Sequence, residues 1–179
     1  MEQPVKIKED VYWIGALDPN LVIFDIVIPT KYGTTYNSYL VRGEKIAVID
    51  TVKAYCVDDF ISKIRSLVRP EDIDYIIINH TEPDHSGGLI RLMELAPNAI
   101  PVFSRGARTF VKNILHKEFD YKEVKDGDSI DLGGKVLKFI PAPFLHWPDT
   151  MFTYLETDKI LFPCDAFGSH YCSDKRFND

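Results

Sequence analysis

Short apolar segments separated by turn residues are the feature that most restricts the fold of this chain. Four of them, VYWIGAL, LVIFDIVI, YNSYLV and KIAVID, fall in the first fifty residues, with DPN, KYG and RGE between them. Each is short for a helix and rich in β-branched or aromatic residues, which predicts strands. We therefore expect the chain to begin with a set of strands.

The middle of the chain changes to helical spacing. Apolar residues recur three or four positions apart in 56–68, with Pro70 just beyond, and this pattern predicts a helix. DYIIIN predicts a buried strand, whereas Leu89–Leu95 and Ser104–Leu115 are expected to be helical. Strands are predicted again for KVLKFIPA, MFTYLET and KILFPCD, and turns for KDGD and LGGK. This order predicts an α/β sandwich with helices against a sheet, not a simple Rossmann alternation.

Composition limits the kind of protein. With 179 residues, 45% of them hydrophobic, the chain is long enough for one domain with its own core. A net charge of −6 with scattered Lys and Arg provides no basic surface for nucleic acid or anionic lipid. The start, MEQPVKIKED, does not read as a signal peptide, and no apolar run is long enough to span a membrane. Three cysteines without CxxC spacing indicate free thiols and a cytoplasmic location.

The stretch NHTEPDHSGG follows DYIIIN and carries the candidate metal ligands His80, Glu82, Asp84 and His85. Alternate side chains of an extended loop point the same way, so His80, Glu82 and Asp84 would converge while His85 serves a second centre. Pro83 stiffens the loop, and the two glycines allow a tight turn into the next helix. The alternative is an ordinary helix cap, since carboxylates favour the N-terminal end of a helix.

Two further candidate metal ligands stand at the ends of apolar strands, as His80 does. His146 lies in PAPFLHWPDTM, and Asp165 ends KILFPCD. Each has a structural alternative: a partly buried His146 bonded to backbone, and Asp165 in a turn or cap before Gly168. The six candidates are too many for one tetrahedral ion, so two ions are predicted, with Asp165 as the bridging carboxylate. The carboxylates favour iron or manganese, with zinc as the alternative.

The order His-x-Glu-x-Asp-His, then a distant His and an Asp, resembles the metallo-β-lactamase superfamily of αββα folds, which usually hold two zinc ions. That superfamily commonly has His where this chain has Glu82, and the Glu variant resembles the flavodiiron proteins. HTEPDHSGG, GTTYNSYLV, HWPDTMFTYL and DAFGSH are all similar to segments of that family. The resemblance covers essentially the whole chain and implies a metallo-β-lactamase-like αββα sandwich.

The resemblance also implies a role for each candidate. One iron would be held by His80, Glu82 and His146, the second by Asp84 and His85, with Asp165 as the bridge. In some members the residue matching His85 leaves the metal and water replaces it. No catalytic residue beyond the ligands, and no FMN contact, is assigned to this chain.

Three other residues are compared with the family pattern. His170 is expected near the site, in a supporting role or on the surface. His116 is expected to face solvent. Asp25 stands where some members have a histidine close to the irons, so a pocket role for that histidine does not carry over.

Several family features do not occur in this sequence. The family requires one more His downstream of the bridging Asp, and the chain stops at Asp179 before it. Later strands of the domain and the flavodoxin-like FMN domain are also missing. We therefore interpret 1–179 as a partial metallo-β-lactamase-like diiron domain, incomplete at its C-terminus, and expect this chain alone to be inactive. The alternatives are a frameshifted remnant and a partner chain that supplies the rest.

For a longer protein, the resemblance implies reduction of dioxygen to water, of nitric oxide to nitrous oxide, or both, with electrons supplied through FMN. It also implies a rubredoxin-like electron donor and a head-to-tail homodimer in which FMN comes from the neighbouring subunit. Neither nucleic acid nor a membrane is expected as a partner. The alternatives are a zinc-dependent hydrolase of the same fold, a non-enzymatic diiron oxygen sensor and an inactive truncated remnant.

Overall fold

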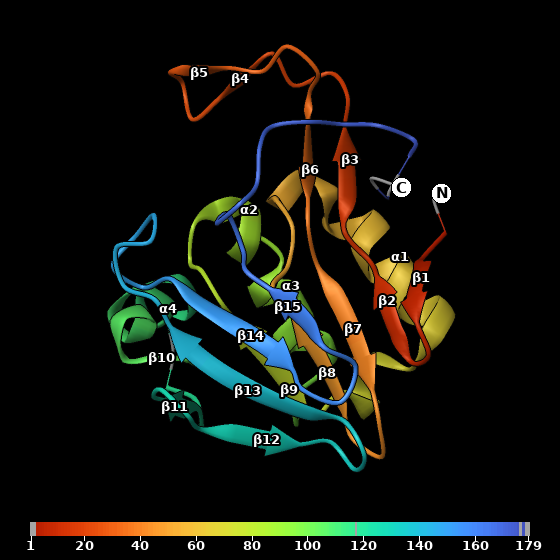
Figure 1. The fold of residues 1–179 in the computed structure, drawn as a ribbon, viewed down its shortest axis with the longest axis vertical. Coiled ribbons are helices and arrows are strands. Elements are labelled where there is room, and N and C mark those ends of the chain that lie inside the picture. Colours follow the sequence, from red (N-terminus) through yellow and green to blue (C-terminus); the bar gives the residue numbers. More distant parts are fainter. Residues whose placement is uncertain (1–2, 117, 176, 178–179) are drawn as a thin grey trace.

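The larger of two facing sheets forms the centre of the molecule (Figure 1). The structure is a computed structural model that describes residues 3–116, 118–175 and 177. Strands β8 to β11 of this sheet run parallel, and β1, β2 and β7 extend it with antiparallel pairs. In order across the sheet the strands are β1 (Val5–Lys8), β2 (Val11–Trp13), β7 (Tyr39–Arg42), β8 (Ile46–Ile49), β9 (Tyr75–Ile78), β10 (Ile100–Ser104) and β11 (Lys122–Val124).

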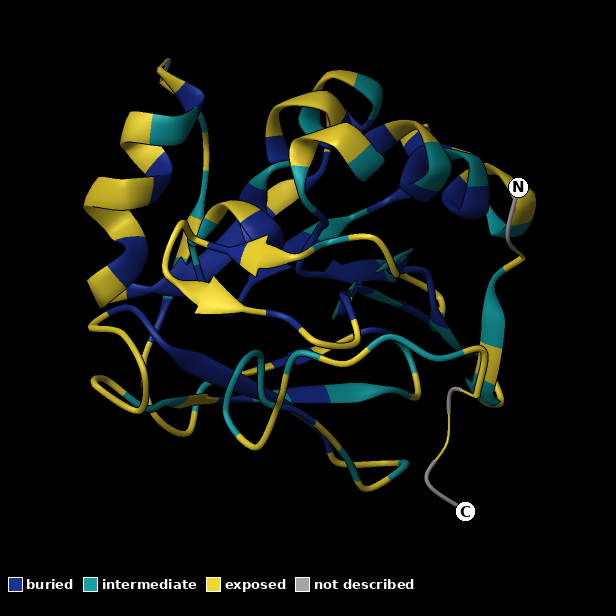
Figure 2. Ribbon diagram, turned by 90° about the horizontal axis from the view of Figure 1, so that it is seen from above, coloured by how far each residue is buried: buried dark blue, intermediate teal, exposed yellow. Residues whose placement is uncertain are grey.

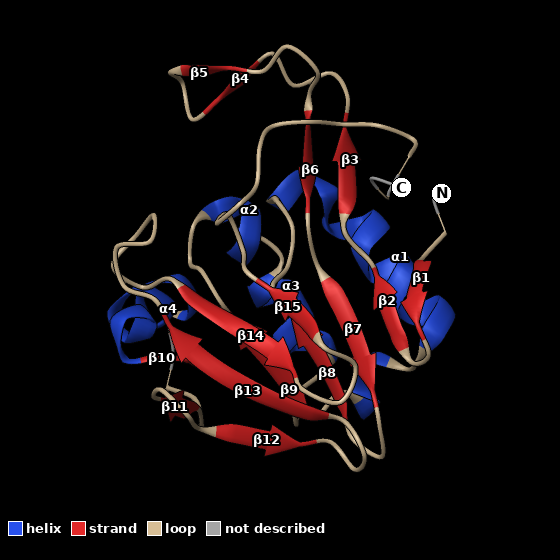
Figure 3. Ribbon diagram, in the orientation of Figure 1, coloured by secondary structure: helices blue, strands red, loops and turns tan. Residues whose placement is uncertain are grey.

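A smaller antiparallel sheet packs in front of the larger one in the view of Figure 3. Its strands, in order, are β12 (Ser129–Asp131), β13 (Val136–Pro141), β14 (Met151–Leu155) and β15 (Ile160–Phe162). Two short pairs complete the strands, β3 (Ala16–Asp18) with β6 (Thr34–Tyr36) and β4 (Ile23–Phe24) with β5 (Ile28–Pro29). The β4–β5 hairpin projects from the body of the molecule at the top of Figure 1.

Helices cover the face of the larger sheet that points away from the smaller one. Figure 2 shows exposed residues along the outer side of these helices and buried residues along the strands beneath them. Three single turns of 3₁₀-helix, η1 (Ala54–Cys56), η2 (Pro70–Asp72) and η3 (Arg105–Ala107), occur in the connections. The α-helices are α1 (Val57–Leu67), α2 (Pro83–Ser86), α3 (Leu89–Leu95) and α4 (Arg108–Leu115).

Two hydrophobic cores explain why the central strands read as continuous apolar runs. Along β9, Ile76 and Ile78 pack into the core shared with the helices, whereas Ile77 packs into the core between the sheets. Successive side chains of a strand point to opposite faces, so a sheet buried on both faces needs an apolar residue at every position. The layers described are therefore helices, a mixed sheet and a second sheet, three of the four layers of the αββα sandwich expected from the sequence.

Most elements predicted from the sequence are confirmed. The strand DYIIIN is β9, the predicted helix at 56–68 is α1, and Leu89–Leu95 is α3 with the predicted bounds. The turn LGGK is also confirmed, since Gly133 and Gly134 have φ of 80° and 86°, values that favour glycine. Strands β10, β11 and β12 were not predicted; Ser104, predicted as helical, ends β10.

The prediction of a single strand for LVIFDIVI is wrong. The segment forms the β4–β5 hairpin, because Asp25 and Ile26 have φ of 46° and 71° and reverse the chain. Its apolar side chains also stay outside the core: Ile26 is 91% exposed. Apolar composition alone therefore misled here, since turn residues such as Gly or Pro are absent from the reversal.

No helix in the described part of the chain has the length and apolar character to cross a bilayer.

We predict that Phe139→Ala destabilises the fold by about 3–5 kcal/mol, because Phe139 is fully buried between the two sheets and the truncation leaves a cavity. Its neighbour Ile140 points to the other face of β13 and is 39% exposed, so Ile140→Ala is the matched control and should cost about 1 kcal/mol or less. Urea unfolding measures both. Equal losses for the two variants would contradict the two-sheet packing.

Candidate metal centre

The candidate ligands meet at the ends of strands from both sheets. His80 follows β9 of the larger sheet, His146 lies in the 142–150 loop between β13 and β14, and Asp165 follows β15. The carboxyl ends of parallel strands are favoured positions for binding sites, because the strand fixes the residue and the loop exposes it.

Asn79, which is fully buried at the end of β9, ties these three segments together. Its backbone carbonyl accepts from the Met151 N–H at 2.9 Å. Its side chain donates to the Phe162 carbonyl at 3.1 Å and accepts from the Thr153 hydroxyl at 2.7 Å. One residue of the larger sheet thus bonds to both β14 and β15 of the smaller sheet, directly beside His80.

The loop after β9 begins extended and then turns into a helix. Glu82 has φ −58° and ψ 148°, and Pro83 starts α2, with the fixed φ that suits a first helical position. The prediction of an extended loop through Asp84 is therefore wrong, and Asp84 and His85 belong to a helical turn. The alternative interpretation as a cap is not supported, since α2 has no side-chain cap hydrogen bond at Glu82.

One group of donors comprises His80, Glu82, His146 and Asp165, with ligand atoms all within 4.8 Å of one another. The Nε2 atoms of both histidines face the same carboxylate oxygen of Glu82, at 3.1 Å for His80 and 3.4 Å for His146. Both also lie 3.6 Å from Oδ2 of Asp165. The two histidines come from different sheets and converge on two carboxylates.

A second group comprises Asp84, His85 and Asp165. His85 Nε2 lies 3.0 Å from Oδ1 of Asp165 and 3.4 Å from Oδ2 of Asp84. Asp165 therefore presents one oxygen to each group, which is the geometry of a bridging carboxylate. The structure brings together all six residues predicted from the sequence. Its two groups correspond to the division that the family resemblance implied. The extended-loop interpretation differed, because it placed Asp84 with His80 and Glu82.

Two buried carboxylate oxygens indicate that cations fit here. Asp84 Oδ1 and Asp165 Oδ2 are buried and have no hydrogen-bond partner in the described part of the chain. A buried carboxylate without partners is costly, and metal coordination is one of the few ways to offset that cost. Both residues belong to the donor groups. A mixed set of carboxylate and imidazole ligands suits iron, manganese or zinc.

Hydrogen bonds between the histidines and the carboxylates shift the pKa values of this cluster. Burial lowers the pKa of His80, but hydrogen bonds to Asp149 and Glu82 outweigh burial and raise that pKa to about 9. Burial likewise opposes protonation of His85, yet hydrogen bonds to Asp165 and Asp50 raise its pKa well above the usual value. The hydrogen bond to His80 lowers the pKa of Glu82 despite burial. These hydrogen bonds therefore favour the protonated form of both histidines and the ionised form of Glu82.

A pocket of about 390 Å³ opens onto both donor groups. Asp25 lines it, where a hydrogen bond to Glu82 raises the pKa of Asp25, and Lys53 Nζ lies 3.4 Å from the Asp25 carboxylate. His170 also lines the pocket without joining either donor group; its Nδ1 lies 3.1 Å from the Thr34 hydroxyl. His116 is exposed, as expected from the sequence.

Sequence reasoning missed two buried carboxylates behind the histidines. Asp149 lies against Nδ1 of His80 at 3.1 Å, and Asp50 lies 3.3 Å from Nδ1 of His85. Asp50 ends the strand-like KIAVID, the placement that singled out His80 and Asp165, so the same rule would have found it. Asp149 follows Pro148 in a loop, and no local pattern marks it.

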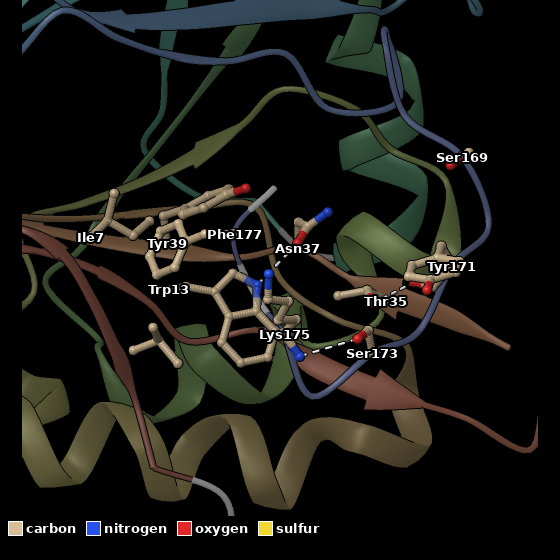
Figure 4. A pocket seen from close by; sticks show the side chains of 11 residues that line it. Ile7, Trp13, Thr35, Asn37, Tyr39, Ser169, Tyr171, Ser173, Lys175 and Phe177 are labelled. Atoms are coloured by element: carbon tan, nitrogen blue, oxygen red, sulfur yellow. Dashed lines mark hydrogen bonds between the residues drawn. The ribbon is translucent and has the colours of Figure 1, made fainter. Parts of the chain in front are cut away.

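A second cavity, of about 380 Å³, lies between β1, β2, β6, β7 and the segment after β15 (Figure 4). Trp13 donates to the Asn37 side chain at 3.0 Å at its wall. The described residues that line this cavity are apolar, aromatic or neutral polar, apart from Lys175.

Comparisons with known proteins agree with this geometry. The model of the ODP family beta lactamase matches residues 34–178. The chain is 51% identical over 176 residues to the flavo-diiron protein FprA2 of Clostridium acetobutylicum, covering 97% of this chain and 44% of that protein. It is 42% identical over 181 residues to the nitric oxide reductase of Moorella thermoacetica, covering 100% of this chain and 45% of that protein.

Among solved structures, rubredoxin oxygen:oxidoreductase from Desulfovibrio gigas superimposes with a TM-score of 0.95 and 34% identity. That match covers 98% of this chain and 44% of the other. The chain thus spans a little less than half the length of the relatives it matches. The fold predicted from the sequence, a metallo-β-lactamase-like sandwich of the flavodiiron type, is confirmed.

We predict that metal binding strengthens as pH rises towards 9. A metal binds the neutral imidazole, and His80 keeps its proton up to a pKa of about 9, so below that pH the metal must displace a proton. One displaced proton raises the apparent affinity about tenfold per pH unit. Chelator-competition titrations with Co²⁺ between pH 6.5 and 8.5 test this, and calorimetry in buffers of different ionisation enthalpy counts the protons. An affinity independent of pH would contradict the competition between metal and proton for His80.

Proposed function

Because the chain belongs to the ODP family of β-lactamase-like domains, we propose that it forms the diiron-binding part of a flavodiiron oxidoreductase. The proposed reaction is the reduction of dioxygen to water, of nitric oxide to nitrous oxide, or both. The observation that carries the proposal is the pair of donor groups that share Asp165. The names of the relatives, which include a nitric oxide reductase and a rubredoxin oxygen:oxidoreductase, support the choice of substrates.

The proposed ligand set follows the two donor groups. His80, Glu82 and His146 hold one iron, Asp84 and His85 hold the second, and Asp165 bridges them. The facing atoms support this division, since Asp165 turns Oδ2 to the first group and Oδ1 to the second. Glu82, where the superfamily commonly has His, adds a negative charge that favours iron over zinc. No catalytic residue beyond these ligands is proposed.

The residues of the chain define the charge and access of the site. When bound, two ferrous ions would supply electrons for the reduction. The carboxylates Glu82, Asp84 and Asp165 offset the positive charge of the oxidised ions, which stabilises that state. Nδ1 of His80 faces Asp149 and Nδ1 of His85 faces Asp50, so Nε2 is directed to the ions in both. The pocket of about 390 Å³ admits molecules the size of dioxygen or nitric oxide.

Electrons are proposed to arrive through FMN bound outside this chain, with a rubredoxin-like protein as the donor. A head-to-tail homodimer would bring the FMN of one subunit to the irons of the next. Exposed apolar side chains beside the pocket-lining residues support a docked partner: Ile26 is 91% exposed, Phe144 79% and Phe167 89%. Exposed apolar patches of this kind mark interaction sites. A cytoplasmic location is proposed on the basis of the free cysteines.

The test of the proposed function is metal analysis and turnover of the protein at its natural length. Two irons per chain, bound FMN and consumption of dioxygen or nitric oxide with a reduced donor are the expected results. Zinc in place of iron without redox activity would favour a hydrolase instead. Two irons without FMN and without turnover would favour an oxygen sensor.

We predict that Asp165→Ala removes both ions, because the carboxylate shared by the two donor groups is lost. Iron per chain, measured by mass spectrometry, should fall from two to near zero. The matched control is Asp158→Asn in the turn between β14 and β15, where Asp158 pairs with Lys135 at 2.6 Å, away from the pocket. Retention of two irons by Asp165→Ala would exclude the bridging role.

A further inference from the structure

We propose that Asp149 and Asp50 are positioning residues of the metal centre. Asp149 orients His80 for one ion, and Asp50 orients His85 for the other. The inference rests on the proposed two-ion site. Both carboxylates are buried, Asp149 completely and Asp50 to within 3% exposure. Neither belongs to the donor groups that face the pocket.

Asp149 determines which nitrogen of His80 is free for a metal. Its two oxygens lie 3.2 and 3.1 Å from Nδ1 of His80, so they accept that N–H. The other nitrogen, Nε2, faces Glu82 and Asp165. When a cation replaces the proton on Nε2, the bond to Asp149 keeps the remaining proton of the neutral imidazole on Nδ1. A carboxylate can only accept hydrogen bonds, so it holds this tautomer and no other.

Asp149 also fastens the loop that carries the second histidine of the same group. One of its oxygens accepts from the Thr81 backbone N–H at 2.8 Å and from the Thr81 hydroxyl at 2.6 Å. Its backbone carbonyl accepts from the Ser104 hydroxyl at 3.1 Å. Asp149 lies three residues after His146, so these bonds hold the 142–150 loop against the ends of β9 and β10. Asp149 thus orients His80 through its side chain, and its bonds to Thr81 and Ser104 fix the loop that carries His146.

Asp50 orients the histidine of the second donor group in the same way. Its Oδ2 lies 3.3 Å from Nδ1 of His85, and its Oδ1 accepts from the Asn79 backbone N–H at 2.7 Å. Its backbone has φ +54°, a left-handed conformation that Asp adopts more readily than most residues, and this turn directs the carboxylate from the end of β8 towards His85. Ser38 donates to its carbonyl at 2.8 Å and holds that backbone.

Substitution by asparagine tests the role without changing the volume of the side chain. At position 50 the amide oxygen must accept from the Asn79 N–H, so its NH2 faces Nδ1 of His85 and favours the tautomer with the proton on Nε2, where the metal should bind. At position 149 the amide oxygen keeps the Thr81 bonds, and the change removes the negative charge that strengthens the bond from Nδ1 of His80. Loss of such a supporting partner typically costs about 10–100-fold in metal affinity. The expected loss falls on one ion: the ion of His80 and His146 for Asp149→Asn, and the ion of His85 and Asp84 for Asp50→Asn.

The experiment measures Co²⁺ affinity and stoichiometry by chelator competition in the protein at its natural length. The variants are Asp149→Asn, Asp50→Asn and the control Asp158→Asn, each alone and combined with His146→Ala. Since His146→Ala removes a ligand of the first ion, adding Asp149→Asn should leave the remaining ion unchanged, whereas adding Asp50→Asn should weaken it about 10–100-fold. Thermal unfolding of the metal-free variants separates positioning from loss of fold.

The inference is supported if each variant weakens one ion about 10–100-fold while the other ion, and the unfolding temperature, stay near those of Asp158→Asn. It is overturned if both ions weaken equally in both variants, if neither weakens, or if the natural protein binds no metal. A protein that binds two ions in this pattern, yet reduces neither dioxygen nor nitric oxide, would contradict only the proposed function.

Discussion

The buried hydrogen bonds of Asn79 hold the two sheets at the separation on which the metal centre depends. Asn79 ends β9 and bonds through backbone and side chain to β14 and β15. These bonds are formed in a fully buried place, where leaving either partner unpaired would cost about 1–3 kcal/mol. Members of the first donor group follow the ends of these strands, so a shift between the sheets would separate His80 from His146 and Asp165.

Backbone strain and buried charge concentrate around the same point. His146 has φ 103°, Asp50 has φ 54° and Cys164, next to Asp165, has φ 44°, all in a region that favours glycine. Such conformations persist where surrounding structure enforces them, and they gather at functional sites. The carboxylates and histidines there also contact one another directly, as His80 does Glu82 and His85 does Asp165. Burying these charged groups costs free energy, and apolar residues of similar volume would often stabilise the fold as well or better. Their presence is best explained by a function that needs them.

Local patterns predicted the elements whose own residues carry the signal. Helix α1 was predicted from apolar spacing and β9 from its isoleucines, because each buries a face that its sequence already defines. The β4–β5 hairpin was mispredicted for the opposite reason: its apolar residues are exposed, and the reversal at Asp25 lacks the usual turn residues. The short strands β11 and β12 were missed, since their pairing with β10 and β13 and not their composition makes them strands.

The sequence by itself determined the chemistry of the site. It showed that imidazoles and carboxylates, with a Glu where His is common, stand at the ends of apolar strands, and the spacing of those strands pointed to a sandwich. The tertiary structure showed how the donors are grouped, because Pro83 turns the chain into α2 and separates Asp84 and His85 from Glu82; the alternation of an extended loop had placed Asp84 with His80 and Glu82, whereas the family resemblance had implied the observed grouping. The tertiary structure also decided which groups stand behind the ligands: His80 and Asp149 are 69 residues apart in the chain, and only the pairing of strands from two sheets brings them into contact.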